Sequence, residues 1–366
     1  MSSEAASGPA EPVAEATEAL TARLTFADVR FEEGSCPLCG ALTRGPTVLE
    51  GRDDTWQKEG RFTLVPCAAC GLIYTCPRPT EDTMRYYYED CYSGEKKEEM
   101  RKAATDSPVS LFTSWMRLRT LEKARRLQPG DVVLDVGCSY GAFIEGVRKV
   151  RGIEAWAIDL DPGTIDDFIN PVDVKVVCGD LRAQQWPDDT FDVITLFETL
   201  EHVYDPVGLL QEVHRLLKPG GIVSVEVPSW DGWPRRVFGS WWLPLLLPTH
   251  LQHFSMEHLG RCVGQAGLET VHHQSMFFPA ENTLSLWVGL GRWLGRVPEG
   301  DKTFGRKLIE GVFGLWLVWV FIFVDIPVTA LLSLFNRTGH QTILARKPVA
   351  AASGAPPARP QPEIAP

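Results

Sequence analysis

The sequence predicts an α/β fold that is built on a parallel sheet and preceded by a small cysteine-rich unit. The apolar run Val132–Val136 is followed by Gly137 and Gly141, which open a predicted helix. A buried strand followed by a glycine turn lets the backbone come close to a nucleotide-like ligand. Further apolar runs recur with room for a helix between them, which is typical of parallel βαβ units. Two Cys-x-x-Cys pairs stand before this pattern.

Composition narrows the class of protein. The chain has 366 residues, of which 44% are hydrophobic and 23% are charged, so it can form one large globular domain with additions. The net charge of −11 predicts no nucleic-acid partner, because phosphate backbones attract basic surfaces. No apolar run follows Met1, and nine cysteines, an odd number, favour a reducing compartment over a disulfide framework. We therefore expect a cytoplasmic protein.

Two matching cysteine turns predict a metal site near the N-terminus. Each is a Cys-x-x-Cys sequence followed by glycine, and together they contain Cys36, Cys39, Cys67 and Cys70. Such a turn directs two thiolates at one metal, and two turns complete the tetrahedral set of a closed, structural zinc site. The stretch between the turns is longer than the usual gap of about 15–20 residues, but it contains segments that can form a hairpin. The sequence therefore predicts a zinc ribbon, with redox-active cysteine pairs as the alternative.

Four apolar runs follow Val132–Val136 in a regular order, and the first three of them end in acidic residues. They are Ala155–Asp159, Val174–Asp180, Phe191–Glu198 and Ile222–Pro228. The carboxylate of Asp159, which ends the first of these runs, can accept two hydrogen bonds from a ribose diol. Because ligands of open α/β sheets bind beyond the carboxyl ends of the strands, these acidic residues predict a nucleotide-type site there.

This pattern resembles the class I S-adenosylmethionine-dependent methyltransferases. Asp135–Gly141 matches their motif I, Asp-x-Gly-x-x-x-Gly, except that Ser139 stands where many members have glycine. The stretches Glu-His-x-x-Asp-Pro at Glu201 and Leu-Lys-Pro-Gly-Gly at Leu217 add to the match. The resemblance is closest to the branch that includes ubiquinone-biosynthesis O-methyltransferases and bacterial sugar or lipid methyltransferases. It implies a Rossmann-like seven-stranded sheet whose antiparallel last strand is Gln341–Lys347.

The resemblance also implies S-adenosylmethionine as the cofactor. Asp180 is expected near the adenine amino group, with Leu181 beside it. The full expected set of cofactor-binding residues is Asp135, Gly137, Cys138, Gly141, Asp159, Leu160, Asp180, Leu181, Phe197 and Glu198. A Glu-x-x-Glu-His stretch like Glu198–His202 is associated with a divalent metal in the ubiquinone branch. The alternative is that Glu201 and His202 orient a loop and contact the cofactor.

Two histidines are candidates for the proton acceptor in catalysis. His250 and His253 belong to a His-x-x-His-Phe-Ser stretch that is typical of the same branch. A neutral imidazole is the ordinary general base for deprotonating a hydroxyl group. S-adenosylmethionine already has a cationic leaving group, so alignment and proton removal are the main tasks left. Of the two histidines, we slightly favour His253 as the general base. The alternative is that both support a helix start with Ser255 as its N-cap.

Two apolar regions predict contact with a membrane or with a hydrophobic acceptor. Trp230–Leu247 is dense in tryptophan and leucine, as in a lid or a membrane-interface patch. Gly311–Val324 is apolar, Asp325 and Pro327 interrupt it, and Val328–Phe335 is apolar again. A single crossing would separate the last strand from its sheet, and proline is expected to break the helix. We expect a re-entrant or interfacial hairpin on the cytoplasmic face of a membrane. The alternative is that these helices pack on each other in a soluble protein or form a homodimer.

These expectations divide the chain into five segments. They are a disordered tail at 1–30, the zinc ribbon at 31–80, connecting helices at 81–130, the methyltransferase domain at 131–347 with a hydrophobic helical insert at about 283–338, and a second disordered tail at 348–366. The expected tails are rich in alanine and proline and cannot bury enough apolar surface to offset their loss of entropy on ordering.

The expected reaction is O-methylation of a hydrophobic, glycan-linked or lipid-linked acceptor at a membrane face. A second possibility is C- or N-methylation of a nucleotide sugar or another soluble small molecule. A third, of another class, is a cofactor-binding scaffold without catalysis, which the intact acids Asp135, Asp159 and Asp180 disfavour.

Overall fold

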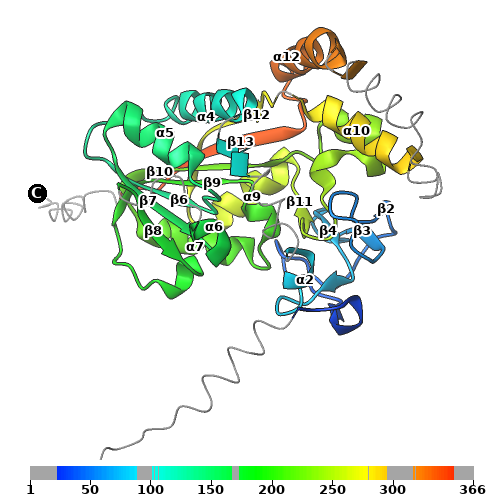
Figure 1. Cartoon of the computed structure of the whole chain (residues 1–366). Helices are drawn as coiled ribbons and strands as arrows, with labels where there is room; N and C mark the ends of the chain where they lie inside the picture. The colour runs from blue at the N-terminus through cyan, green and yellow to red at the C-terminus, as the bar shows by residue number, and fades with distance from the viewer. Residues whose placement is uncertain are drawn as a thin grey trace, which may run out of the picture. The chain divides into compact units, whose positions relative to one another are not determined.

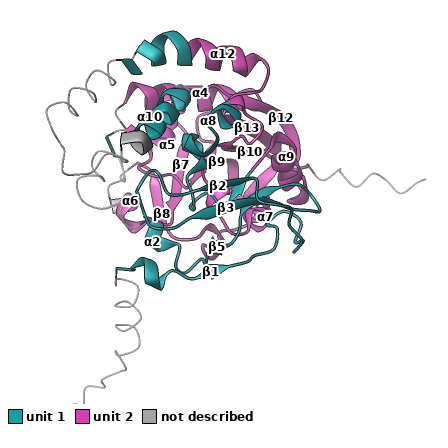
Figure 2. Cartoon of the chain, turned by 90° about the vertical axis from the view of Figure 1, so that its right-hand side faces the viewer, with its two compact units in different colours: residues 1–103, 234–253, 280–325 teal, residues 104–233, 254–279, 326–366 magenta. Residues whose placement is uncertain are grey.

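The computed structural model describes residues 23–88, 101–102, 104–105, 107–166, 173–278, 280–294, 316–317 and 319–349. The chain forms two compact units, each built from three stretches (Figure 2). Unit 1 contains residues 1–103, 234–253 and 280–325, and unit 2 contains residues 104–233, 254–279 and 326–366. The units differ from the predicted segments, which follow one another along the chain, because two later stretches of the chain return to unit 1.

Unit 2 contains the predicted seven-stranded sheet (Figure 1). Its strands, in spatial order, are β12 (Glu269–Met276), β13 (His340–Arg346), β10 (Leu217–Pro228), β9 (Phe191–Phe197), β6 (Val132–Val136), β7 (Glu154–Asp159) and β8 (Lys175–Cys178). β13 is antiparallel to both of its neighbours, and the pairs from β10 to β8 are parallel. The Rossmann-like sheet with an antiparallel last strand is therefore confirmed.

The strand order explains where unit 2 can bind a ligand. The chain runs outward from β6 through β7 to β8 and then returns to β9 on the other side of β6. The crevice beyond the carboxyl ends of β6 and β9 is thus a topological switch point, the usual ligand site of open α/β sheets. The central strands are buried on both faces, as their nearly continuous apolar runs predict.

Helices cover both faces of this sheet. α4 (Pro108–Leu121) and α5 (Ala142–Arg151) pack on one face, and α7 (Pro206–Leu216) and α9 (Met256–Gln265) on the other (Figure 1). α6 is a short helix, Pro162–Asp166. Ser255 caps α9, because its side chain accepts a hydrogen bond from the backbone N–H of His258, as the alternative interpretation of this stretch expects. Apolar side chains of α4 and α5 share one core with β6 and β7.

The N-terminal part of unit 1 contains the predicted hairpin between the cysteine turns. β2 (Leu49–Gly51), β3 (Phe62–Pro66) and β4 (Ile73–Thr75) form an antiparallel sheet. Its fourth strand is β11 (Gln252–His253), which pairs with β4. The sequence analysis places residues 252–253 in a loop of the methyltransferase domain, and this placement is wrong. A strand of two residues carries no periodic pattern, so only its hydrogen bonds to β4 reveal it.

Further short elements complete this part of unit 1. β1 (Phe31–Glu32) pairs with β5 (Arg78–Pro79), and α2 is Arg85–Tyr88. A 3-10 turn, η1 (Phe26–Asp28), precedes β1, and Thr25 donates to its Asp28 carboxylate from both backbone and side chain. The predicted tail at 1–30 is therefore too long. Residues 1–22 and 350–366 lie outside the described residues.

The helical insert differs from the prediction at Pro327. A π-helical turn, η7 (Phe321–Asp325), is followed directly by α12 (Ile326–Leu334), in which Pro327 is the second residue. Proline is tolerated in the first turn of a helix, because the N–H that it lacks has no helical partner there. The expected break at Pro327 is therefore wrong. Of the predicted helix Gly311–Val324, residues 311–315 and 318 lie outside the described residues.

Asp325 has a structural role that the sequence analysis misses. Its side chain is buried and accepts hydrogen bonds from the Asn282 amide and from the backbone and hydroxyl of Thr283, at 2.7–2.8 Å. These donors stand at the start of α10 (Glu281–Leu294), so Asp325 caps that helix from a distant part of the chain. The helix pair in unit 1 is thus α10 with η7, whereas the prediction pairs 311–324 with 328–335.

Three short helical segments of the tryptophan-rich stretch are α8 (Trp233–Phe238), η4 (Gly239–Trp241) and η5 (Leu243–Leu245). The side chains of Trp242, Leu245 and Leu247 are buried, so this part of the predicted lid belongs to the core of unit 1. Trp242 also donates a hydrogen bond from its indole nitrogen to Glu281, at 2.6 Å. Within the described ranges, we find no helix with the length and apolar character needed to cross a membrane.

Candidate functional site

The loop after β6 is shaped by positive backbone angles. Gly137 has φ +71° and Gly141 has φ +81°, a region that favours glycine. The amides of Gly137 and Cys138 donate to the carbonyl of Ile158 on β7, at 2.8 and 3.2 Å. A Cβ atom on Gly137 would lie 2.4 Å from Thr199 Oγ1, so this position has no room for a side chain. Ser139 also has a positive φ, +50°, which fits the glycine found there in many related sequences.

Asp159 joins this loop to the end of β7. Its carboxylate accepts hydrogen bonds from the backbone N–H groups of Ser139 at 2.9 Å and Asp161 at 3.1 Å. Burial raises the pKa of Asp159, and these hydrogen bonds partly oppose the increase. The acid predicted to bind a ribose therefore lies against the glycine loop, and the neighbouring Leu160 is exposed.

Asp135 is buried within the sheet. Its carboxylate accepts a hydrogen bond of 2.6 Å from the Thr195 hydroxyl, which joins β6 to β9. Burial raises the pKa of Asp135 to about 7, although the Thr195 hydrogen bond and the charge of Arg117 act in the opposite direction. This hydrogen bond links β6 to β9 next to the glycine loop that follows β6.

Asp180 stands at the end of the β8 region. It caps η2 (Leu181–Ala183) through the Arg182 amide, and it forms an ion pair of 2.8 Å with the Arg182 guanidinium. The Arg182 hydrogen bond lowers the pKa of Asp180. Leu181 is buried beside it. A ligand amino group at Asp180 would have to share this carboxylate with Arg182.

Arg117 on α4 is a charged group that the sequence analysis misses. Two of its N–H groups donate to one oxygen of Glu226 on β10, at 2.9 and 2.7 Å. Its guanidinium lies over the ring of Phe197, 4.6 Å from the centroid. The signal that could have revealed it is Glu226 itself, because a carboxylate inside a buried strand requires a charged or hydrogen-bonding partner.

Glu198 and Glu201, which follow β9, have pKa values that are shifted in opposite directions. Glu198 has φ +55°, and its amide donates to the carbonyl of Glu226 at 2.9 Å. Burial favours a higher pKa for Glu198, but His340, Arg117 and His202 outweigh it and lower the pKa. Burial and the charge of Glu198 raise the pKa of Glu201 well above its ordinary value. The pKa values of the two neighbouring carboxyl groups are therefore shifted in opposite directions.

Residues 111–273 match the family described as "Methyltransferase domain". Residues 111–273 therefore form a methyltransferase domain. This match covers β6 to β10, the glycine loop and the acidic strand ends described above, and it confirms the resemblance seen in the sequence.

Similar proteins of known identity match part of the chain. The ubiquinone biosynthesis O-methyltransferase of Pseudomonas paraeruginosa is 31% identical over 153 residues, which are 38% of this chain and 65% of that protein. The enzyme of the same name from Xanthomonas campestris pv. campestris is 33% identical over 141 residues, 36% of this chain and 58% of that protein. The chain thus spans less than two thirds of the length of these relatives. A SAM-dependent methyltransferase structure from Archaeoglobus fulgidus has a TM-score of 0.44 and 19% identity, covering 68% of this chain and 99% of that chain.

The two predicted catalytic histidines lie in unit 1, whereas all ten predicted cofactor residues of the methyltransferase domain lie in unit 2. His250 Nδ1 lies 2.8 Å from the carbonyl of Pro244, so it donates there and Nε2 carries no hydrogen in the neutral ring. His253 is part of β11. Burial, with a smaller contribution from Arg235, lowers the pKa of His253 to about 3, which makes it a weak proton acceptor.

Unit 1 also brings the four predicted cysteines together. Sγ of Cys36 lies 3.6 Å from that of Cys70, Sγ of Cys39 lies 3.5 Å from that of Cys67, and all four lie within 4.8 Å of one another. Four thiolates about 2.3 Å from a tetrahedral zinc ion have sulfurs about 3.8 Å apart, so this cluster fits zinc. Against the effect of burial, the amides of Cys70 and Ala69 lower the pKa of Cys67 to about 7, whereas burial raises the pKa of Cys36 and Cys70.

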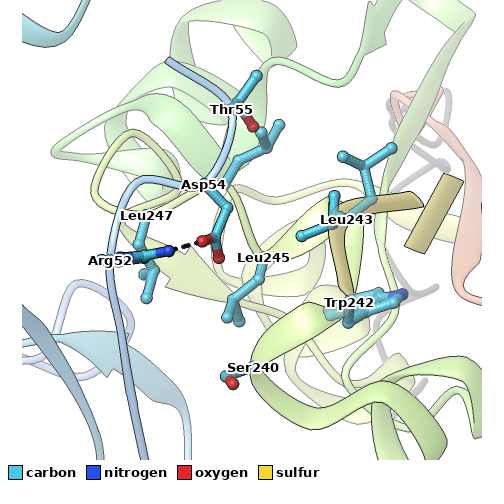
Figure 3. A pocket seen from close by; sticks show the side chains of 10 residues that line it. Arg52, Asp54, Thr55, Ser240, Trp242, Leu243, Leu245 and Leu247 are labelled. Carbon is cyan, nitrogen blue, oxygen red and sulfur yellow. Dashed lines mark hydrogen bonds and ion pairs between the residues drawn. The ribbon is translucent and has the colours of Figure 1, made fainter. Parts of the chain in front are cut away.

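A pocket within unit 1 has an apolar wall and a charged rim (Figure 3). Leucines from the 243–247 segment line it together with Val288 of α10. Arg52 and Asp54 form an ion pair of 3.2 Å at the rim. Residues of the predicted lid and of the ribbon hairpin, such as Leu243 and Asp54, therefore line the same pocket.

Proposed function

We propose that the protein transfers a methyl group from S-adenosylmethionine to an oxygen of a hydrophobic or lipid-linked acceptor at the cytoplasmic face of a membrane. The observation that carries the proposal is the loop after β6, where Gly137 leaves no room for a side chain and Asp159 holds the Ser139 amide. A backbone that a ligand can approach closely, next to a ribose-binding acid, suits an adenosine-containing ligand. The match of residues 111–273 to methyltransferase domains identifies the class.

The roles of individual residues form part of the proposal. Gly137, Cys138 and Gly141 present backbone to the cofactor, and Asp159 binds its ribose. Asp180 and Leu181 contact the adenine, while Asp135, Leu160, Phe197 and Glu198 complete the site. The cofactor supplies a methyl group on a positively charged sulfur, so the protein must orient the acceptor and remove a proton. The sequence predicts His250 or His253 as the acceptor of that proton, but the lowered pKa of His253 makes it a weak acceptor, and both histidines lie in unit 1.

Exposed apolar side chains support the membrane part of the proposal. In the helical stretch before Asp325, Trp319 is 64% exposed and Phe323 is 58% exposed, and their rings lie 4.2 Å apart. α10 exposes Trp287, and α12 exposes Leu331 and Leu334. Large exposed apolar surfaces mark interaction sites, and tryptophan prefers the boundary between water and lipid.

The acceptor can be identified by incubating the protein with methyl-labelled S-adenosylmethionine and a total extract of bacterial membranes and cytosol. We expect the label in the organic phase, on an oxygen atom found by mass spectrometry. Label in the aqueous phase, on carbon or nitrogen of a nucleotide sugar, would favour the soluble alternative. Binding of S-adenosylhomocysteine without any labelled product would favour a non-catalytic scaffold.

Membrane attachment predicts a loss of flotation on removal of the exposed rings. The double variant Trp319→Ser, Phe323→Ser should bind vesicles of phosphatidylethanolamine and phosphatidylglycerol at least about tenfold more weakly than the parent, because each buried ring contributes about 1.5–3 kcal/mol. The matched control is Leu42→Ser, Val48→Ser, which removes exposed apolar side chains from the ribbon. Equal flotation of all three proteins would contradict attachment through this surface. Loss of a dimer without loss of flotation would instead assign the surface to self-association.

A further inference from the structure

A carboxylate–imidazole pair lies at the carboxyl edge of the sheet in unit 2. His340 Nε2 is 3.6 Å from Glu198 Oε2. Glu198 directly follows β9, and His340 is the first residue of β13. Because β13 runs antiparallel to β10, its first residue pairs with Pro228, the last residue of β10. The end strand of the sheet thus starts at the edge where the cofactor residues of the parallel strands lie.

His340 is held firmly in this position. Its side chain is 4% exposed. Its ring stacks on Phe278 with the centroids 4.5 Å apart and an angle of 29° between the planes. Its carbonyl accepts a hydrogen bond of 3.0 Å from the Thr338 hydroxyl. Burial and stacking on Phe278 restrict the orientation of the imidazole, which is a requirement for a group that acts in catalysis.

Glu198 links this histidine to the glycine loop. Its positive φ is uncommon for a residue with a side chain, and strain of this kind is concentrated at functional sites. The next residue, Thr199, donates a hydrogen bond of 3.0 Å to the carbonyl of Val136 and occupies the space that a side chain at Gly137 would need. Glu198 is therefore the neighbour in sequence of Thr199, which contacts the proposed cofactor loop directly.

The surrounding charges suit a proton acceptor. Arg117 of α4 and His202 of η3 (Leu200–His202) act on Glu198, and Glu198 and His340 in turn act on Glu201. Glu226 of β10 forms the ion pair with Arg117. Against the opposing effect of burial, His340, Arg117 and His202 lower the pKa of Glu198, and His340 is the group in contact with it. An ionised carboxylate beside an imidazole orients the ring and stabilises its protonated form.

We propose that His340, oriented by Glu198, accepts the proton of the acceptor hydroxyl during methyl transfer. This inference rests on the proposed function. The hydroxyl oxygen forms a bond to the methyl carbon, the electron pair of the carbon–sulfur bond goes to sulfur, and the hydroxyl proton goes to His340. The distance of 3.6 Å between His340 Nε2 and Glu198 Oε2 is longer than a hydrogen bond. Catalytic hydrogen bonds often shorten only in the complex with the substrate.

The first test compares His340→Gln with the parent and with His273→Gln. His273 is a matched control, since it lies on the neighbouring strand β12 and faces the Gln341 amide oxygen at 3.0 Å instead of a carboxylate. We expect His340→Gln to slow labelled methyl transfer to the membrane extract by about 10²–10⁴-fold, with S-adenosylhomocysteine affinity within about threefold of the parent. The control should keep the parental rate. A parental rate in His340→Gln, with an unchanged pH profile, would overturn the inference.

A second test needs no acceptor. The imidazole of His340 can be titrated by NMR in the parent and in Glu198→Gln. We expect the variant to lower the pKa of His340 by at least about one unit, because it removes the charge that stabilises the imidazolium. An unchanged pKa would overturn the pairing, and this measurement decides the matter even if His340→Gln does not fold. A parent that transfers no methyl group contradicts the proposed function, whereas a fully active His340→Gln contradicts only this inference.

Discussion

Replacing Gly137 with alanine should raise the dissociation constant for S-adenosylhomocysteine at least about 100-fold, the largest effect expected from adding one methyl group to this protein. The new Cβ would lie 2.4 Å from Thr199 Oγ1 and 2.9 Å from Thr199 Cγ2. Thr199 cannot move without breaking its hydrogen bond to Val136. The loop must therefore shift, and it carries the amides of Gly137 and Cys138 with it. Isothermal titration calorimetry measures the loss of affinity directly.

Gly130→Ala is the matched control for this experiment. Gly130 has φ +86°, close to that of Gly137, but a Cβ there meets no atom within 4 Å. This variant includes the backbone strain, of order 1–3 kcal/mol, without the clash. We expect it to melt at a slightly lower temperature and to bind S-adenosylhomocysteine as the parent does. Parental affinity in Gly137→Ala would show that the loop does not approach the cofactor.

Removal of zinc should unfold the ribbon of unit 1. We expect one zinc ion per chain by elemental analysis, and no bound zinc in Cys36→Ser. Binding free energies of structural zinc sites in small peptides are about 10–16 kcal/mol, comparable with the whole stability of a typical domain. A chelator should therefore expose the hairpin β2–β3 to proteases. Because β11 pairs with β4 in the same sheet, the chelator should also release the segment that contains His253.

The control for the zinc experiment is Cys178→Ser. Cys178 is an exposed cysteine in unit 2, outside the cluster of four. This variant should retain the metal and the parental resistance to proteases. Stoichiometric zinc in Cys36→Ser, or a ribbon that resists proteases after the metal is removed, would contradict a structural site with four cysteine ligands.

The predictable part of the fold depends on patterns that are local in the sequence. Buried parallel strands require apolar runs, so Val132–Val136 and its successors identify β6, β7, β8, β9 and β10 without any tertiary information. Gly137 identifies its turn because only glycine combines a positive φ with no side chain. The cysteine turns identify their cluster because a metal needs several ligands at close spacing. The order of these patterns then indicates the family.

The missed features involve pairs of residues that are distant in the sequence. Asp325 looks like an interruption of an apolar helix, but it caps α10, which starts more than forty residues earlier. Arg117 gains its importance only from Glu226, which lies 109 residues later. Neither partner stands in a motif, because a single polar residue in an apolar run has no periodicity.

The sequence by itself therefore determined the sheet, the glycine loop, the cysteine cluster and the methyltransferase class, since backbone chirality and apolar periodicity act over a few residues. Only the tertiary structure decided that β11 joins the ribbon and that His340 meets Glu198. The direction of β13 brings His340 to the carboxyl edge, and against the effect of burial His340, Arg117 and His202 lower the pKa of Glu198 there. Strand direction and desolvation are properties of the assembled fold, and no local pattern encodes them.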